Sequence, residues 1–157
     1  MNNEINRFIE AQEKDYQQAL SEIKLGRKRS HWMWYIFPQF IGLGHSETSK
    51  YFAIKSLNEA KEYLDHPILG SRLKEITNVL LTLDTDNANK IFGSRDDLKL
   101  KSCMTLFSVV CNEDGNVFKK LIDKYFDNCL DKRTLKLLNK YKEMEEDDCL
   151  TNYPSMD

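Results

Sequence analysis

The sequence has few of the patterns that mark common kinds of site. Its four cysteines show neither a C-x-x-C pair nor a nearby histidine pattern, so we expect no metal and no other cofactor. The chain contains no run of about 18 apolar residues, which argues against a membrane-spanning segment. Its N-terminal residues, MNNEINRFIE, are polar and acidic and do not resemble a signal peptide. These features predict a protein with reduced cysteines in the cytoplasm.

The chain also lacks a strong net charge of either sign. Lysine and arginine total 23 against 25 acidic residues, which gives a formal net charge of −2. Proteins that hold extended nucleic acid usually carry a basic surface, so we expect no such partner here. Any positive surface must be local, and Arg27, Lys28 and Arg29 form the densest basic run. The composition does not indicate an oligomeric state.

Glycine and proline are scarce, with six and three residues, and most of the chain between them has the spacing of amphipathic helices. We therefore predict a mainly α, single compact multi-helix domain over residues 1–142, followed by an acidic, frayed tail over 143–157. The expected helices are 4–25, 46–53, 57–64, one after Pro67, a short one ending at Gly93, 96–110, 117–127 and 132–145.

One segment departs from this helical pattern. Residues 33–41 lack helical spacing and are interrupted by Pro38, so they predict a short irregular or extended, strand-like segment. They belong to a longer stretch, 27–44, in which the basic run precedes both tryptophans of the protein. We expect Gly42 and Gly44 at its end to form a bend that allows close approach of the backbone.

The first half of this stretch contains groups that can bind phosphate. Guanidinium, ammonium and hydroxyl donors for hydrogen bonds to an anion come from four consecutive residues, Arg27, Lys28, Arg29 and Ser30. His31 follows as a ligand contact or, in an enzyme, as an acid or base. The alternative is a solvated basic turn, because cations are favourable at the C-terminal end of a helix. The sequence leaves both interpretations open.

The two tryptophans are expected to have different roles. One of Trp32 and Trp34 would stack on the base of a nucleotide and the other would anchor the core, which requires the stretch to bend or turn helical. Gln39 carries an amide that can select a base or sugar edge. The alternatives are that both tryptophans lie in the core and that Gln39 belongs to a structural turn.

A second polar segment lies at residues 92–107. Asp97 and Lys99 in this segment are candidate ligand contacts that would share a pocket with His31. An aspartate there can polarise a ribose hydroxyl. The alternative is structural, because acidic residues at a helix start complement the helix dipole.

Four long and unusual segments follow one another along the chain: GRKRSHWMWYIFPQFIGLG, HPILGSRL, IFGSRDDLKLKSCMTLF and DKRTLKLL. In this order they resemble a widespread microbial family catalogued as domain of unknown function 1810, over roughly Phe8 to Leu138. The resemblance implies a mainly helical single domain and brings no settled activity. In style the chain is also similar to the ADP-ribose-processing NADAR group, whose small proteins surround a nucleotide-type ligand with polar and aromatic residues.

These features together predict a small-molecule binding module. Its ligand would be a phosphate-bearing nucleotide-type molecule, ADP-ribose-like or a cyclic nucleotide, which the protein senses or sequesters. One alternative is an enzyme that cleaves an N-glycosidic or phosphate bond of a nucleotide-derived substrate, with His31, Asp96 or Asp97 in proton transfer. Another is a protein-interaction domain that uses exposed aromatic residues.

Overall fold

The computed structural model describes residues 4–145, and these residues confirm the prediction of a compact, mainly helical domain. They form nine helices, which are α1 (Asn6–Lys24), α2 (Met33–Ile36), α3 (Glu47–Tyr51), α4 (Leu57–Asp65), α5 (Leu69–Thr82), α6 (Ala88–Phe92), α7 (Asp96–Val110), α8 (Val117–Tyr125) and α9 (Lys132–Glu145). Residues 146–157, most of the expected acidic tail, lie outside the described residues. Within the described part, no helix has the length and apolar character needed to cross a membrane.

The helix ends follow the capping residues that the sequence supplies. The hydroxyls of Ser46 and Ser56 accept hydrogen bonds from the N–H groups of Ser49 and Glu59, at 3.1 and 3.0 Å, and so begin α3 and α4. Gly26, with a φ of 80°, ends α1 as expected. The bounds of α9 are also those expected from the sequence.

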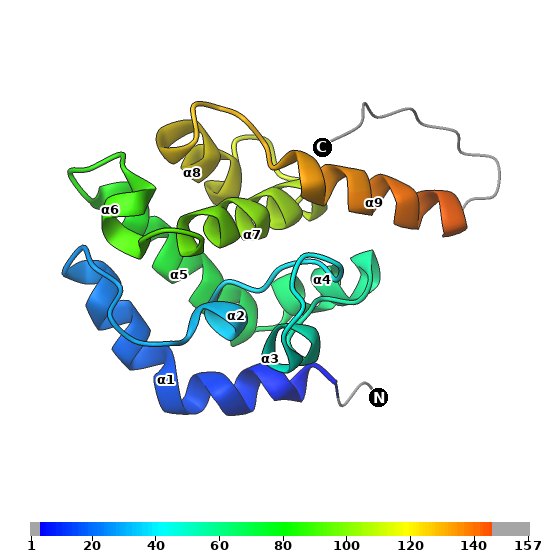
Figure 1. Ribbon diagram of the computed structural model, residues 1–157, viewed down its shortest axis with the longest axis horizontal. Helices are drawn as coiled ribbons and strands as arrows, with labels where there is room; N and C mark the ends of the chain where they lie inside the picture. Colours follow the sequence, from blue (N-terminus) through cyan, green and yellow to red (C-terminus); the bar gives the residue numbers. More distant parts are fainter. Residues whose placement is uncertain (1–3, 146–157) are drawn as a thin grey trace.

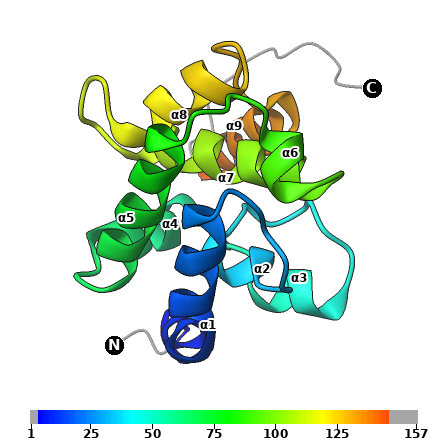
Figure 2. The ribbon, with the colours of Figure 1, turned by 90° about the vertical axis from the view of Figure 1, so that its left-hand side faces the viewer.

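Two groups of helices lie on opposite sides of the molecule. In Figures 1 and 2, α1, α2 and α3 lie in the lower part and α6, α7, α8 and α9 in the upper part, with α4 and α5 between them. α7 packs against α4, α6, α8 and α9, whereas α5 packs against α1, α4 and α8. Large aromatic side chains fill the core between the two groups, including the fully buried Phe8, Phe37, Tyr63, Phe107 and Phe118.

The segment expected to be extended begins with a helical turn instead. α2 buries its first and last residues, Met33 and Ile36, and leaves the two aromatic residues between them half-buried. The extended prediction was wrong here because every residue of the turn is apolar or aromatic, which hides the spacing of the two buried side chains. After Pro38, an isolated parallel bridge joins Phe40 to Ile54.

A buried ion pair fixes α3 relative to α1 and α4. The two terminal guanidinium nitrogens of Arg7 lie 3.0 and 3.1 Å from the carboxylate oxygens of Glu59, and neither side chain is more than 7% exposed. Arg7 also donates to the carbonyls of Tyr51 and Ala53, at 2.7 and 2.8 Å. Its donors therefore hold the end of α3 in place, and the start of α3 borders the candidate site.

Candidate functional site

The basic loop after α1 folds around a carboxylate of α1 itself, that of Glu22. Glu22 Oε1 accepts hydrogen bonds from the N–H groups of Arg29 and Ser30 and from Trp32 Nε1, at 2.7, 3.0 and 2.9 Å. Glu22 Oε2 accepts from the Ser30 hydroxyl at 2.6 Å and from Gln18 Nε2 at 2.8 Å. Burial by itself would raise the pKa of Glu22, but these hydrogen bonds outweigh it and lower the pKa to about 2. The loop thus binds an anion that belongs to the protein.

Trp32 is part of the core and supports a lysine at its edge. The tryptophan is 1% exposed, and its ring centroid lies 6.1 Å from that of Phe37 and 6.4 Å from that of Phe92. Lys28 Nζ lies 5.0 Å from the Trp32 ring centroid, and the Lys28 N–H donates to the carbonyl of Ile91 at 2.8 Å. The buried indole and α6 therefore fix the position of Lys28.

Asp96, at the start of α7, connects two lysines. Its Oδ2 lies 2.9 Å from Lys28 Nζ, and its Oδ1 lies 3.0 Å from Lys99 Nζ. Burial raises the pKa of Asp96, but the hydrogen bonds and charges of the two ammonium groups outweigh it and hold the pKa below its ordinary value of 3.8. Lys99 Nζ also lies 4.4 Å from the ring centroid of Trp34. Two ammonium groups thus share a single carboxylate, which leaves one positive charge uncompensated among the residues that the structure describes.

These side chains line a cavity of about 310 Å³, which we call the lysine cavity. It lies between the basic loop, α2, the start of α3 and the first turn of α7. Its polar lining consists of Lys28, His31, Ser46, Thr48, Asp96 and Lys99, and three residues of α2 complete the wall. The volume is at the lower end of the range for small-ligand pockets, about 300–1,000 Å³.

A second cavity, of about 320 Å³, lies between α2, residues 39–44 and α3, and we call it the glutamine cavity after Gln39. Trp34 lines both cavities and is therefore their common wall. The expected bend is present in this cavity, since Gly42 has a φ of 105°. Gly44 packs so closely that an added Cβ would lie 2.5 Å from Ser49 and 2.9 Å from Trp34 Cη2.

Half of the predicted contact residues come together around these two cavities. Lys28, His31, Trp34 and Lys99 line the lysine cavity, and Gln39 lines the glutamine cavity. The two tryptophans lie in different environments: Trp32 is enclosed in the core, and Trp34 borders both cavities. Their separation follows from the helical turn of α2.

Other predicted contacts lie away from the cavities. Arg27 and Arg29 have exposed side chains and line neither cavity. Ser30 directs both its N–H and its hydroxyl to Glu22, so neither donor is available to a ligand. Trp32 is enclosed by the core and offers no ring face for stacking. Of the basic run, Lys28 is the residue that lines a cavity.

The two aspartates at the start of α7 point in different directions. Asp97 Oδ2 accepts from the amide of Asn89 at 3.3 Å, so the Asp97 carboxylate faces α6, and Asp96 is the aspartate at the lysine cavity. Sequence reasoning missed Ser46 and Thr48 as cavity residues. The sequence already gives Ser46 a structural role as a helix cap. Residues 46–48 are also far from the start of α7 in the sequence, so no local pattern shows that they share a cavity.

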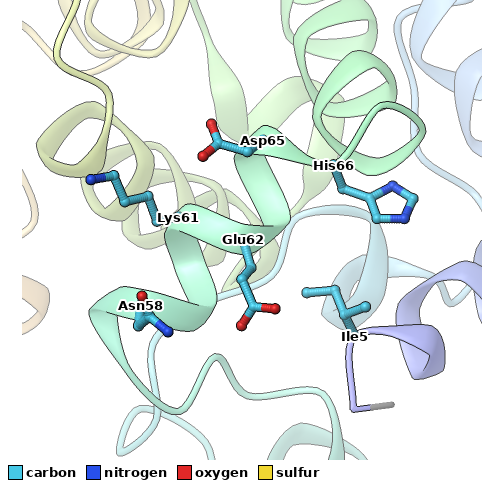
Figure 3. A pocket seen from close by; sticks show the side chains of 6 residues that line it. All are labelled: Ile5, Asn58, Lys61, Glu62, Asp65 and His66. Atoms are coloured by element: carbon cyan, nitrogen blue, oxygen red, sulfur yellow. The ribbon is translucent and has the colours of Figure 1, made fainter. Parts of the chain in front are cut away.

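A third hollow, of about 290 Å³, lies beside α4 and is shown in Figure 3. Glu62, His66 and Ile5 lie on one side of the helix, and Lys61 and Asp65 lie on the other. Side chains of both charge signs line it, and it has no tryptophan, tyrosine or phenylalanine in its wall. Over residues 4–145, no group of three or more histidine, cysteine, aspartate and glutamate side chains is arranged to hold a metal ion.

The fold and the two cavities define a helical domain with a cationic, aromatic-walled site. The chain belongs to the family described as Protein of unknown function (DUF1810), whose model matches residues 2–138. It is similar to a solved structure, that of the conserved hypothetical protein Rv1873 from Mycobacterium tuberculosis. The two sequences are 44% identical, and the match covers 85% of this chain and 95% of the other with a TM-score of 0.81. No curated protein gives a significant match.

Proposed function

We propose that this protein binds a small phosphate-bearing, nucleotide-type molecule, ADP-ribose-like or a cyclic nucleotide, and senses or sequesters it. The phosphate occupies the lysine cavity and contacts Lys28 and Lys99. The observation that carries this proposal is the uncompensated positive charge that remains when both lysines share Asp96. A phosphate oxygen beside them gains charge-assisted hydrogen bonds.

The two lysines are held in position before any ligand arrives. The Lys28 side chain is 8% exposed and that of Lys99 is 27% exposed, and each ammonium group also lies over a tryptophan ring. Because their positions are fixed, little side-chain entropy is lost on binding. Because they are partly desolvated, their attraction to an anion is stronger than that of lysines on an open surface.

Calorimetry with a matched pair of lysine variants tests the proposal. Lys99→Met keeps the apolar stem and removes the charge at the lysine cavity. Lys101→Met is the control, because Lys101 lies on the same helix, 5.8 Å from the ring centroid of Phe126, and lines neither cavity. The ligands are AMP, cyclic AMP, ADP-ribose and inorganic phosphate.

We expect at least one of these nucleotide ligands to bind the unmodified protein. Its affinity falls about tenfold or more in Lys99→Met, since a hydrogen bond to a charged group contributes about 1.5–3 kcal/mol. Lys101→Met binds like the unmodified protein. The absence of binding at millimolar concentrations of every ligand, or an equal loss in both variants, would contradict the proposal.

One observation favours a second candidate, an enzyme that cleaves a nucleotide-derived substrate, because His31 and Asp96 line the same cavity. Both Asp96 oxygens are engaged by lysines and the Asp96 pKa is lowered, so this group is a poor proton donor at neutral pH. We therefore propose binding rather than turnover. Chromatography after incubation with NAD and ADP-ribose distinguishes binding from turnover. Products that form with the unmodified protein, and not with a folded His31→Ala variant, would support the enzyme.

A further inference from the structure

The glutamine cavity contains a buried donor without a partner. Gln39 is 4% exposed, and its side-chain Nε2 has no hydrogen-bond partner. Among the residues that the structure describes, it is the only buried side-chain nitrogen or oxygen in this condition. Folded proteins satisfy the great majority of their buried polar groups, so the atom requires an explanation.

Gln39 lines the glutamine cavity, and two hydrogen bonds fix the backbone around it. The Gln39 carbonyl accepts from the N–H of Ile54 at 2.8 Å, and the N–H of Ile41 donates to the Ile54 carbonyl at 2.9 Å. These two hydrogen bonds form the isolated bridge next to the cavity. The amide therefore cannot swing to solvent by a backbone shift without breaking them.

The rest of the cavity offers apolar walls to a flat ring. Phe40, Ile41 and Ala53 provide apolar surface, the Trp34 indole forms a further wall, and Lys50 and Lys55 also line the cavity. Lys99 Nζ covers the Trp34 ring from the lysine cavity, at 4.4 Å from its centroid. Trp34 also lines the glutamine cavity, where its indole adds aromatic surface to the wall.

We propose that the glutamine cavity binds the ring of the ligand, a planar heterocycle such as a nucleobase. A carbonyl oxygen or ring nitrogen of this heterocycle accepts a hydrogen bond from Gln39 Nε2, while its face packs against Trp34. The inference rests on the proposed function, because it assigns the phosphate and the ring of one molecule to two cavities with a common wall. Gln39 then selects ligands by the acceptor at the ring edge, and the lysines select them by charge.

Separate probes for the ring and for the phosphate test this assignment. The probes are adenosine, guanosine, cytidine and uridine, their 5′-monophosphates, and inorganic phosphate. Gln39→Met keeps the length of the side chain and removes the donor. Gln17→Met is the control, because Gln17 is exposed on α1 and lines neither cavity.

We expect at least one nucleoside to bind and to shift the Gln39 side-chain amide resonance in NMR spectra. Gln39→Met weakens binding of that nucleoside and its monophosphate by about fivefold or more, since a buried hydrogen bond is lost. It leaves the affinity for inorganic phosphate unchanged. Gln17→Met binds every probe like the unmodified protein.

Thermal unfolding without ligand distinguishes a ligand donor from a structural one. Because Nε2 has no partner in the folded chain, Gln39→Met loses no hydrogen bond and its Tm is equal to or higher than that of the unmodified protein. A Tm several degrees lower, together with unchanged nucleoside binding, would overturn the inference and make Gln39 structural.

The two proposals fail in different ways. The ring assignment is overturned if nucleosides do not bind, or if they bind Gln39→Met as well as the unmodified protein. The proposed function still stands in that case, provided that phosphate and nucleotides bind and that Lys99→Met weakens their binding. If nucleosides bind in a manner that depends on Gln39 and the phosphate adds no affinity, the proposed function fails and the ring site stands.

Discussion

Glu22 and Trp32 are joined by a hydrogen bond of 2.9 Å, from the indole Nε1 to the carboxylate Oε1. This bond connects the last turns of α1 to the buried tryptophan that supports Lys28. The same carboxylate accepts the N–H groups of the loop between them. The geometry of the lysine cavity therefore depends on a residue that does not line it.

Removal of the Glu22 side chain should be one of the more damaging changes to this fold. In Glu22→Ala, the part-buried hydroxyl of Ser30 and the buried indole N–H of Trp32 lose their acceptor, and we expect the free energy of unfolding to fall by roughly 3 kcal/mol. Urea unfolding measures this difference. Glu10→Ala, on the exposed side of α1, is the control and changes stability by less than about 0.5 kcal/mol. Equal stability of the two variants would show that the Glu22 hydrogen bonds contribute little.

The same carboxylate makes stability depend on pH. Its pKa is about 2 in the folded protein against an ordinary value of 4.5, so its stabilising contribution is complete above about pH 4.5 and is lost as the pH falls toward 2. Asp96 and Glu59, whose pKa values are also lowered, add to the loss in the same direction.

Glu22→Gln should make the stability of the protein less dependent on pH in the acidic range. Tm measured from pH 7 to pH 2 falls less steeply in the variant than in the unmodified protein, because the variant has no Glu22 carboxyl to protonate. Parallel curves for the two proteins below pH 4.5 would mean that Glu22 is not the group that titrates.

The two tryptophans should respond differently to ligand and to quencher. Trp32 is buried and Trp34 is half-buried at both cavities. We expect acrylamide to quench Trp34→Phe, which retains the buried tryptophan, more weakly than it quenches the unmodified protein. We also expect AMP to change the emission of the unmodified protein more than that of Trp34→Phe. A ligand response of equal size in the two proteins would contradict contact between the ligand and Trp34.

Gly44 should be required for the shape of the common wall. A Cβ at this position would lie 2.5 Å from Ser49 and 2.9 Å from Trp34, so Gly44→Ala forces both to shift and destabilises the protein by roughly 1–3 kcal/mol. Gly115→Ala is a control away from both cavities: a Cβ there would have nothing within 4 Å, and any loss of stability would come from the positive φ of 63° at this position. We expect the first variant alone to alter Trp34 fluorescence and AMP affinity. Unaltered fluorescence in Gly44→Ala would contradict the close packing.

Much of the fold follows from local chemistry that the sequence displays. Ser46 and Ser56 begin helices where their hydroxyls accept N–H groups, and Gly26 ends α1 with a positive φ that favours glycine. The turn of α2 was missed because an unbroken apolar and aromatic run has no visible period. Its helical form depends on tertiary packing of Met33 and Ile36 against the core.

The sequence indicated several of the residues that line the cavities, but not which of them contact one another. The anion-binding character of the loop was visible, but Glu22 was not, because a single glutamate near the end of a helix has the appearance of a solvated residue. The pairing of Lys28 with Asp96 joins residues far apart in the sequence, and no local pattern encodes it. The unpartnered amide of Gln39 becomes evident only when all its neighbours are in place.

A crystal structure of the protein grown with AMP at millimolar concentration would test directly whether the two cavities hold one ligand. We expect the phosphate within hydrogen-bond distance of Lys28 Nζ and Lys99 Nζ, about 2.7–3.2 Å, with the adenine ring between Trp34 and Gln39. Crystals that contain AMP elsewhere on the protein, or that leave both cavities without ligand while calorimetry finds no binding, would contradict this expectation.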